Sequence, residues 1–380
     1  MIAVIEPTYA RGDHAAVNAA LLHAIAHAFP DEPLDFAATA DHRQAVAQVV
    51  PLPASVRWSE IAVMAPGGVH ASRFHAQWRA MRDLVTRTRP RVLVVLSSGP
   101  ETFFAVRALA AAHSGLRIFV VLHGNLNDAV GWRSRDPRRR WFDYRAGLRI
   151  VRHARIRLVV LEEHIRDAAI RRGLASEAQV HVWPHPLNGS EISNEAGDLR
   201  SPLRIAFLGA ATRAKGFDTF LAIVAAVRDG TPRVPVAFTC IGPQLESFPE
   251  AARLGLSGSA APLDRAEFLS RLDAVDYVLL PYGMQAYELT ASGSLLDCIA
   301  RAKPVIALDL AGIRDLVRRH GEIGFVRSSP DALATFIASD PALGDATRYR
   351  AFQERLRTIA RLRTPAALAA RLRDDIGPPS

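Results

Sequence analysis

Short apolar runs alternate with longer amphipathic stretches along the chain, and this alternation predicts its main elements. An apolar run bounded by polar or glycine-containing turns indicates a buried strand, whereas apolar residues spaced three and four apart indicate a helix. Strands are predicted at residues 2–5, 92–96, 118–122, 157–161, 180–183, 203–208, 236–241, 278–280 and 305–308, with weaker candidates at 34–37 and 61–64. Strands that alternate with helices favour the α/β class, with largely parallel, doubly wound sheets.

Amphipathic stretches lie between these strands. The first, residues 14–29, follows a polar loop in which Asp13 is the expected N-cap. Further helices are predicted at residues 74–88, 101–112, 217–227, 265–272, 315–319 and 330–337, and the arginine-rich residues 348–373 predict one or two more.

The alternation is interrupted once, near the middle of the chain. Residues 189–201 are rich in Gly, Ser and Glu and have few apolar residues, which indicates a linker. A chain of 380 residues is long enough for two domains with separate cores. We therefore expect one domain at residues 1–188, a second at 202–345, and C-terminal helices at 346–380.

The composition is that of an ordinary globular protein, with 49% hydrophobic and 22% charged residues. Both cysteines, Cys240 and Cys298, lie in apolar segments and predict buried thiols in a reducing compartment. Residues 1–6 enter a strand without the basic and apolar regions of a secretory signal, and no apolar run has the length of a membrane-spanning helix. These features predict a cytoplasmic location.

The net charge of +9 comes almost entirely from arginine, because Lys215 and Lys303 are the only lysines in the sequence. A lysine kept in such a background can mark a place that needs a compact ammonium group. The alternative is chance, and Lys303 can equally serve to end a helix. The excess of positive charge suits anionic partners such as nucleotides or phospholipid surfaces.

The segment from Tyr277 to Asp309 predicts a strand, a loop, a helix and another strand. Ser292 is the expected N-cap of that helix and Gly293 its first residue, while Pro304 prevents its continuation. Free backbone N–H groups and the helix dipole at such a start attract an anion, most often a phosphate. The alternative is an ordinary helix start, of which every α/β sheet has several.

A second candidate anion site follows the predicted strand at residues 203–208. Gly209 ends that strand, and Lys215 and Gly216 form a turn before the next helix. An ammonium beside backbone N–H groups neutralises a phosphate and stabilises it as a leaving group, and Arg213 can add a second positive charge. The alternative is a turn with solvated charges.

Candidate residues in the first half are fewer. His123 ends the predicted strand 118–122, at the edge of a sheet where ligand residues commonly lie. His14 and Asn18 share one face of a helix and are candidates for substrate contact, or else solvated polar positions. The first strand has no dinucleotide-binding glycine fingerprint after it, and the scattered histidines form no convincing metal site, so we expect no metal.

Four motifs together resemble those of GT-B glycosyltransferases, in particular the retaining group 1 family (glycosyltransferase family 4). In chain order they are Val182-Trp-Pro-His-Pro-Leu187, Leu203–Gly209 with Lys215-Gly-Phe-Asp218, Asp276-Tyr-Val-Leu-Leu-Pro-Tyr282, and Asp297 with Ala300-Arg-Ala-Lys-Pro-Val-Ile-Ala307. They follow the order and spacing of that family. The resemblance covers the second half well and the first half in outline.

This resemblance implies two Rossmann-like domains that face each other across a cleft. The sugar nucleotide is expected on the C-terminal domain and the acceptor mostly on the N-terminal one, with the final helices packing back on the first domain. The implied catalytic residues are Lys215, Arg213 and His123. The implied donor-binding residues are Gly209, Lys215, Gly216, Glu288, Ser292, Gly293, Ser294 and Asp297, and the acceptor-side residues are His14 and Asn18.

Some of these positions depart from the family pattern. Asp297 is implied to bind the ribose, where the family more often has glutamate. The first glutamate of the family's Glu-x7-Glu motif falls on Leu289, one residue from Glu288, and Ser292-Gly293 resembles a sub-group that presents Ser-Gly to the phosphates. The family's arginine before the lysine falls on Ala210, and Arg213 is a candidate substitute.

The implied function is retaining transfer of a sugar from a nucleotide-diphosphate sugar to a hydroxyl acceptor, in polysaccharide or glycolipid assembly, with no separate cofactor. A nucleotide-sugar epimerase and a non-catalytic sugar-nucleotide-binding relative are the alternatives. Residues 132–142 combine arginines with aromatic residues, which suits an anionic membrane and a lipid-linked acceptor. A solvated charged helix explains them equally well, and without a nucleic-acid-binding motif we expect no nucleic acid.

Overall fold

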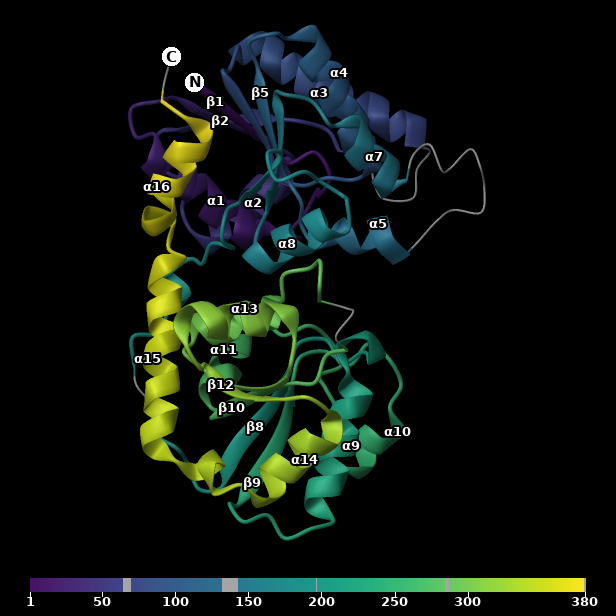
Figure 1. Cartoon of the computed structure of the whole chain (residues 1–380). Helices are drawn as coiled ribbons and strands as arrows, with labels where there is room; N and C mark the ends of the chain where they lie inside the picture. The colour runs from purple at the N-terminus through teal and green to yellow at the C-terminus, as the bar shows by residue number, and fades with distance from the viewer. Residues whose placement is uncertain (64–69, 132–142, 196, 284–286, 379–380) are drawn as a thin grey trace. The chain divides into compact units, whose positions relative to one another are not determined.

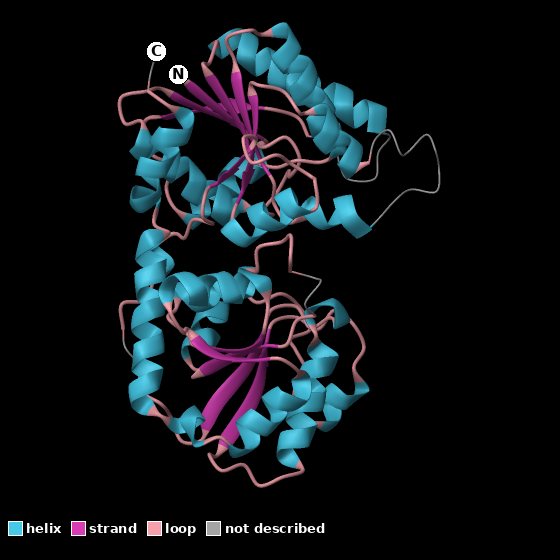
Figure 2. Cartoon of the chain, in the orientation of Figure 1, coloured by secondary structure: helices cyan, strands magenta, loops and turns pink. Residues whose placement is uncertain are grey.

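The computed structural model describes residues 1–63, 70–131, 143–195, 197–283 and 287–378, which form two compact units (Figures 1 and 2). The first unit consists of Met1–Gly189, Leu289–Ala291 and Arg363–Ser380, and the second of Ser190–Glu288 and Ser292–Leu362. Each unit is built around its own parallel sheet, as the alternating pattern predicted.

The sheet of the first unit has seven strands in the order β3-β2-β1-β4-β5-β6-β7, and every neighbouring pair is parallel. Its strands are β1 (Ile2–Ile5), β2 (Leu34–Ala38), β3 (Val56–Glu60), β4 (Val92–Val95), β5 (Arg117–Val121), β6 (Ile156–Val160) and β7 (Val180–Val182). The central strands are apolar on both faces because helices cover both sides of the sheet. Successive β1 residues accordingly enter two different cores, with Ala3 in one and Val4 in the other.

Helices of the first unit divide between these two cores. They are α1 (Ala15–Ala28), α2 (Ala40–Val49), α3 (His70–Thr88), α4 (Pro100–Ala112), α5 (Asp128–Gly131), α7 (Tyr144–Ile150), α8 (Glu163–Arg171) and α16 (Pro365–Ile376). Helices α3, α4, α7 and α8 contribute to one core, and α1 and α16 to the other.

The sheet of the second unit has five parallel strands in the order β12-β11-β10-β8-β9. The strands are β8 (Leu203–Leu208), β9 (Val236–Ile241), β10 (Tyr277–Leu280), β11 (Val305–Leu308) and β12 (Gly324–Arg327). The helices are α9 (Phe217–Arg228), α10 (Pro249–Arg253), α11 (Arg265–Asp273), α12 (Gly293–Ala300), α13 (Ala311–His320), α14 (Pro330–Ser339) and α15 (Ala346–Leu362).

Two local predictions near the N-terminus are wrong. The strand predicted at residues 61–64 instead lies at Val56–Glu60, because the parallel register with β2 pairs Leu34 with Val56 and ends at Ala38 and Glu60. Asp13 is not the N-cap of α1. His14 holds that position in the left-handed region, with φ 61°, and its side chain makes no capping bond.

The last two helices belong to different units, although the sequence predicted that both pack on the first domain. Helix α15 is part of the second unit, where it packs on α12. Helix α16 packs on α1 in the first unit, as Figure 1 shows. Its Asp375 accepts hydrogen bonds from Trp183 Nε1 and binds His181 Nδ1, both at 2.8 Å. Because Trp183 is buried, this contact ties the end of the chain to the first sheet.

Candidate active site

The second sheet reverses its strand order between β8 and β10, which are adjacent but not consecutive in the chain. Ligands of open α/β sheets bind at such a switch point, beyond the carboxyl ends of the strands. Every predicted donor-binding residue lies on the loops that follow these two strands or in α12, whose N-terminus ends the second loop.

The predicted residues Gly209, Lys215 and Ser294 come together at this point. A Cβ atom added to Gly209 would lie 2.8 Å from Lys215 Nζ and 3.1 Å from Ser294 Oγ. Ser294 in turn donates a hydrogen bond of 2.9 Å to the Leu208 carbonyl. The Lys215 ammonium group and the Ser294 hydroxyl therefore both lie beside Gly209. A larger residue at position 209 would occupy the space that they fill.

Gly216 fixes the turn that carries Lys215. Its φ of 70° lies in the left-handed region, and an added Cβ would lie 2.3 Å from the Pro281 carbonyl oxygen. Thr212 caps the turn by accepting a hydrogen bond from the Lys215 amide at 3.3 Å. The turn after β8 thus packs directly on the backbone that follows β10, and only glycine fits there.

The start of α12 has the capping that the sequence predicted. Ser292 Oγ accepts a hydrogen bond of 3.2 Å from the Leu295 amide, which confirms Ser292 as the N-cap. A Cβ added to Gly293 would meet no atom within 4 Å, so this residue has open space beside it. The first N–H groups of a helix have no partner within the helix, and they can bind an anion there.

Asp297, one turn further along α12, is held by Arg265. Arg265 Nη2 lies 2.8 Å from Asp297 Oδ1, and the same guanidinium binds Glu191 with Nε and Nη2 at 2.8 and 2.9 Å. Burial raises the pKa of the Asp297 carboxyl, while Arg265 and Lys215 act in the opposite direction. Burial lowers the pKa of Lys215, and the charge of Asp297 opposes this shift.

Two further predicted residues, Arg213 and Glu288, lie in the segments that follow β8 and β10. Arg213 is paired with Glu246 at 3.0 Å, lies over the Phe248 ring at 5.0 Å, and is 64% exposed. Glu288 lies in a turn just before Leu289, which is buried in the first unit.

Lys303 is structural, because its buried ammonium donates to the carbonyls of Asp273 and Val275 at 2.9 and 3.0 Å.

The candidate residues of the first half form a separate group in the first unit. The rings of His14 and His123 lie 4.6 Å apart, and His14 lies 4.5 Å from the Tyr9 ring. Burial lowers the pKa of His14 and holds that of His123 well below its usual value, so both imidazoles are neutral at pH 7. The buried His123 Nε2 has no hydrogen-bond partner among the described residues. His185, whose pKa burial lowers to about 4, adds a third neutral imidazole to this group.

Asn18 is buried rather than solvated. Its amide nitrogen donates to Glu6 Oε2 at 3.1 Å and lies 3.0 Å from His42 Nε2. Glu6 also accepts hydrogen bonds from the amides of Thr8 and Tyr9 at 2.9 and 3.0 Å and from the Ser97 hydroxyl. Asn18 therefore helps to hold the loop after β1.

Sequence reasoning missed Glu6, His42, His185, Arg265 and Glu191. For Glu6 a signal existed, because it directly follows the first predicted strand and so lies at the carboxyl edge of the sheet. Glu191 fell in the segment interpreted as a linker.

Residues 289–291 belong to the first unit although both flanking segments belong to the second. Thr290 Oγ1 donates to the Gly124 carbonyl at 2.9 Å and accepts from Asn127 Nδ2 at the same distance. Leu289 is buried in the first core. Residues 289–291 are therefore bonded, within the first unit, to the segment that directly follows His123.

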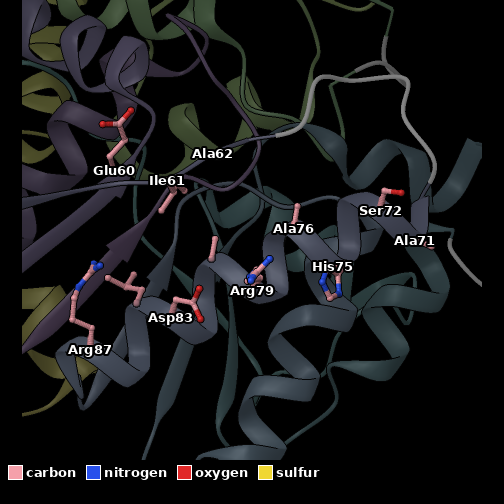
Figure 3. Close-up of a pocket in the computed structure, with 12 residues that line it drawn as sticks. Glu60, Ile61, Ala62, Ala71, Ser72, His75, Ala76, Arg79, Asp83 and Arg87 are labelled. Atoms are coloured by element: carbon pink, nitrogen blue, oxygen red, sulfur yellow. The ribbon is translucent and has the colours of Figure 1, made fainter.

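A cavity of about 770 Å³ lies between α3 and the end of β3 in the first unit (Figure 3). Ala76, Ala80 and Leu84 give it apolar walls, while Arg79 and Arg87 are among the charged residues at its border. A small hollow next to it shares several of its residues and extends to Pro7, at the start of the loop that carries His14. The cavity contains none of the residues predicted for the site.

Among the described residues, no group of three His, Cys, Asp or Glu side chains is arranged to hold a metal ion. Within the same part of the chain, no helix is both long and apolar enough to cross a membrane. The basic and aromatic segment at residues 132–142 lies outside the described residues.

Two parallel α/β units, each with candidate residues at the carboxyl edge of its sheet, define the GT-B class of protein. Within that class, residues 202–339 match the family described as "Glycosyl transferases group 1". This match lies in the second unit and confirms the resemblance seen in the sequence motifs. No curated protein matches the sequence.

Solved structures share the whole two-unit fold at low sequence identity. Sucrose-phosphate synthase from Thermosynechococcus elongatus is 16% identical, with a TM-score of 0.69 over 99% of this chain and 98% of that one. WaaG, a glycosyltransferase involved in lipopolysaccharide biosynthesis, is 14% identical, with a TM-score of 0.64 over 100% of both chains. A putative UDP-N-acetylglucosamine 2-epimerase from Listeria monocytogenes is 14% identical, with a TM-score of 0.57 over 99% and 95%. These likenesses show the fold alone.

Proposed function

We propose that this chain is a retaining glycosyltransferase that moves a sugar from a nucleotide-diphosphate sugar to a hydroxyl acceptor. The observation that carries the proposal is the meeting of Lys215 and Ser294 over Gly209, beside the open N-terminus of α12. A diphosphate leaving group develops negative charge as the sugar departs, and fixed positive groups at that place lower the barrier.

Three parts of the donor site then have definite roles. Lys215 and the first turn of α12 hold the diphosphate, through an ammonium group and free backbone N–H groups. Asp297 accepts hydrogen bonds from the ribose hydroxyls. In a retaining transfer the acceptor hydroxyl attacks from the face that the nucleotide leaves. The new glycosidic bond forms as the bond between the sugar and the diphosphate breaks, and the departing diphosphate takes up the proton of the hydroxyl. We propose that the reaction needs only the donor and the acceptor, without a separate cofactor or metal ion.

We assign the acceptor to the first unit. The neutral imidazoles of His14 and His123 can donate a hydrogen bond to a sugar hydroxyl or accept one from it. His123 Nε2 has no hydrogen-bond partner among the described residues. Asn18 positions the loop that carries His14. A saccharide or lipid-linked acceptor in cell-surface polysaccharide or glycolipid assembly fits the excess of positive charge, with the enzyme in the cytoplasm or at the inner face of the membrane.

A nucleotide-sugar epimerase is the second candidate, because a putative epimerase has the same fold. That chemistry needs an acid and a base around one sugar carbon. The residues brought together at the switch point instead suit a diphosphate. A non-catalytic relative that only binds a sugar nucleotide is the third candidate, and the displaced register of Glu288 favours it.

The test begins with a thermal-shift screen of UDP-, GDP- and ADP-linked sugars, because a ligand that binds only the folded state raises its melting temperature. Release of the sugar from the donor that binds is then measured for the wild type, Lys215→Ala and Lys215→Arg. We expect a loss of about 100-fold or more in kcat for Lys215→Ala, the cost of removing one group that stabilises a developing anion. Lys215→Arg should lose less, because it keeps the charge.

Three outcomes would contradict the assignment. An unchanged rate in Lys215→Ala would remove Lys215 from the site. An epimerised sugar that stays attached to its nucleotide would favour the epimerase, and binding without turnover against a broad acceptor panel would favour the non-catalytic relative.

A further inference from the structure

Arg265 occupies a defined position between two carboxylates. It is the first residue of α11, directly after Asp264, which caps the helix by accepting from the Glu267 amide at 2.8 Å. Its guanidinium binds Glu191 through two nitrogens and Asp297 through one of them. Such a forked contact fixes the plane of the guanidinium as well as its position.

The exposure of the three side chains differs. Glu191 and Asp297 are 15% and 18% exposed, whereas Arg265 is 46% exposed. Its charged end also lies 5.4 Å from the Phe268 ring centroid on the same helix. The carboxylates are therefore mostly enclosed while the guanidinium between them still reaches solvent.

Two polar atoms of this ion pair are not used in the contacts described so far. Arg265 Nη1 and Asp297 Oδ2 take part in no hydrogen bond among the described residues. Arg265 Nη1 carries two hydrogens that it can donate, and Asp297 Oδ2 is an acceptor. The two residues that carry these atoms are in direct contact. Two adjacent hydroxyl groups match this pair, because each hydroxyl can donate one hydrogen bond and accept another.

The charge of the group decides between a sugar and a phosphate as its ligand. One guanidinium between two carboxylates carries a net charge of −1, which repels a phosphate and tolerates a neutral diol. The positive charge for a phosphate lies instead at Lys215, whose ammonium faces Gly209 and Ser294. The geometry thus separates a place for the diphosphate from a place for hydroxyl groups.

We propose that Arg265 is a specificity-determining residue that, together with Asp297, reads the 2′- and 3′-hydroxyls of the ribose in the donor nucleotide. Glu191 is a positioning residue that holds the guanidinium against Asp297. This inference rests on the proposed function, since it takes the donor to be a nucleotide. It adds a donor group to the ribose site and predicts selection of ribose over 2′-deoxyribose.

The test compares the binding of a nucleoside diphosphate with that of its 2′-deoxy counterpart, as UDP with dUDP, GDP with dGDP and ADP with dADP. We expect the wild type to prefer the ribose form by about tenfold to 100-fold, because the bound nucleotide would enclose the pair and a 2′-deoxyribose would leave one of its polar atoms without a partner. Arg265→Ala should reduce that preference to about twofold, since Asp297 then loses both its orientation and its neighbouring donor. Isothermal titration calorimetry at matched salt gives both constants.

Arg271→Ala is the matched control, because Arg271 lies on the same helix and is paired with the exposed Glu267. It should keep the preference of the wild type. Lys215→Ala should weaken both nucleotides by a similar factor and leave their ratio unchanged. If Arg265→Ala does not fold, Arg265→Lys keeps the charge but not the fork and should lower the ratio in part.

An unchanged ratio in a folded Arg265→Ala protein would overturn the inference while leaving the proposed function intact. An equal loss of both nucleotides would also overturn it, because that is the result expected of a merely structural arginine. A wild type that binds none of these nucleotides would instead remove the proposed function, and this inference with it.

Discussion

At the scale of single residues, Lys215 shows how a charge can be kept in a partly buried place. Its ammonium lies beside Gly209 and Ser294, and burial lowers its pKa. An anion bound there would favour the charged form and raise that pKa again. The protonated form of Lys215 is therefore favoured more strongly when an anion is bound than when the site has no ligand.

This predicts opposite effects of alkaline pH on stability and on donor binding. The folded state releases the Lys215 proton at a lower pH than the unfolded state, so the free energy of unfolding should gain a contribution as pH rises from the lowered pKa towards 10.5. Over the same range the affinity for a nucleoside diphosphate should fall, because the ammonium is lost. Urea unfolding and calorimetric titration across that range measure the two effects.

The control is Lys215→Met, which should remove both pH dependences while keeping most of the side-chain volume. Parallel changes in stability and affinity, or pH curves that Lys215→Met leaves unchanged, would show that another group titrates.

At the residue scale, the sequence singles out a position only where a local pattern marks it. Lys215 is one of only two lysines in the sequence, and it lies next to a glycine in a predicted turn. Ser292 directly precedes a segment with the apolar spacing of a helix. Arg265 could not be found in this way. Its partners Glu191 and Asp297 are 74 and 32 positions away in the sequence, and it is one arginine among many.

At the scale of elements, the site depends on how two loops pack on each other. Gly216 approaches the Pro281 carbonyl so closely that any side chain would collide with it, and its backbone lies in the left-handed region. The start of α9 and the end of β10 are therefore joined by backbone contact at the switch point.

Gly216→Ala should destabilise the second unit by roughly 2–5 kcal/mol, the combined cost of a left-handed non-glycine residue and of overpacking. Chemical denaturation measures the change. Gly230→Ala, beyond the other end of α9, is the matched control, because an added Cβ there lies 3.8 Å from its nearest neighbour. It should change stability by less than about 0.5 kcal/mol. Equal effects of the two substitutions would refute the packing argument.

Elements were predicted best where burial on both faces left a continuous apolar run, as at β1 and β11, whose bounds agree with the structure. The edge strand β3 was misplaced because its sequence, Val-Arg-Trp-Ser-Glu, alternates polar and apolar residues next to a more apolar run. Its position depends on pairing with β2, which a local pattern does not contain. Helix α2 was missed for a similar reason, since it buries only His42 and Val46.

At the scale of the whole molecule, the first unit is assembled from both ends of the chain. Leu372 of α16 is 1% exposed in the core that also contains residues of α1. Leu362, at the end of α15 in the second unit, is 53% exposed. Leu362 and Leu372, ten positions apart, therefore belong to different units, and only Leu372 is buried.

Leu372→Ala should destabilise the first unit by about 2–5 kcal/mol through loss of buried area and creation of a cavity, while Leu362→Ala should change stability by less than about 0.5 kcal/mol. Hydrogen exchange followed by mass spectrometry should show faster exchange in residues 1–189 of Leu372→Ala. Faster exchange confined to residues 202–339 would contradict the division into units.

The discontinuous makeup of the first unit also has a consequence for biosynthesis. Residues 1–189 leave the ribosome long before α16 is made, so the apolar surface of α1 that α16 covers stays open while the whole second unit is being synthesised. At about 5–20 residues per second, this delay lasts roughly ten seconds or more. The second unit can therefore complete its core first, while the nascent first unit still exposes the apolar surface of α1 that α16 later covers.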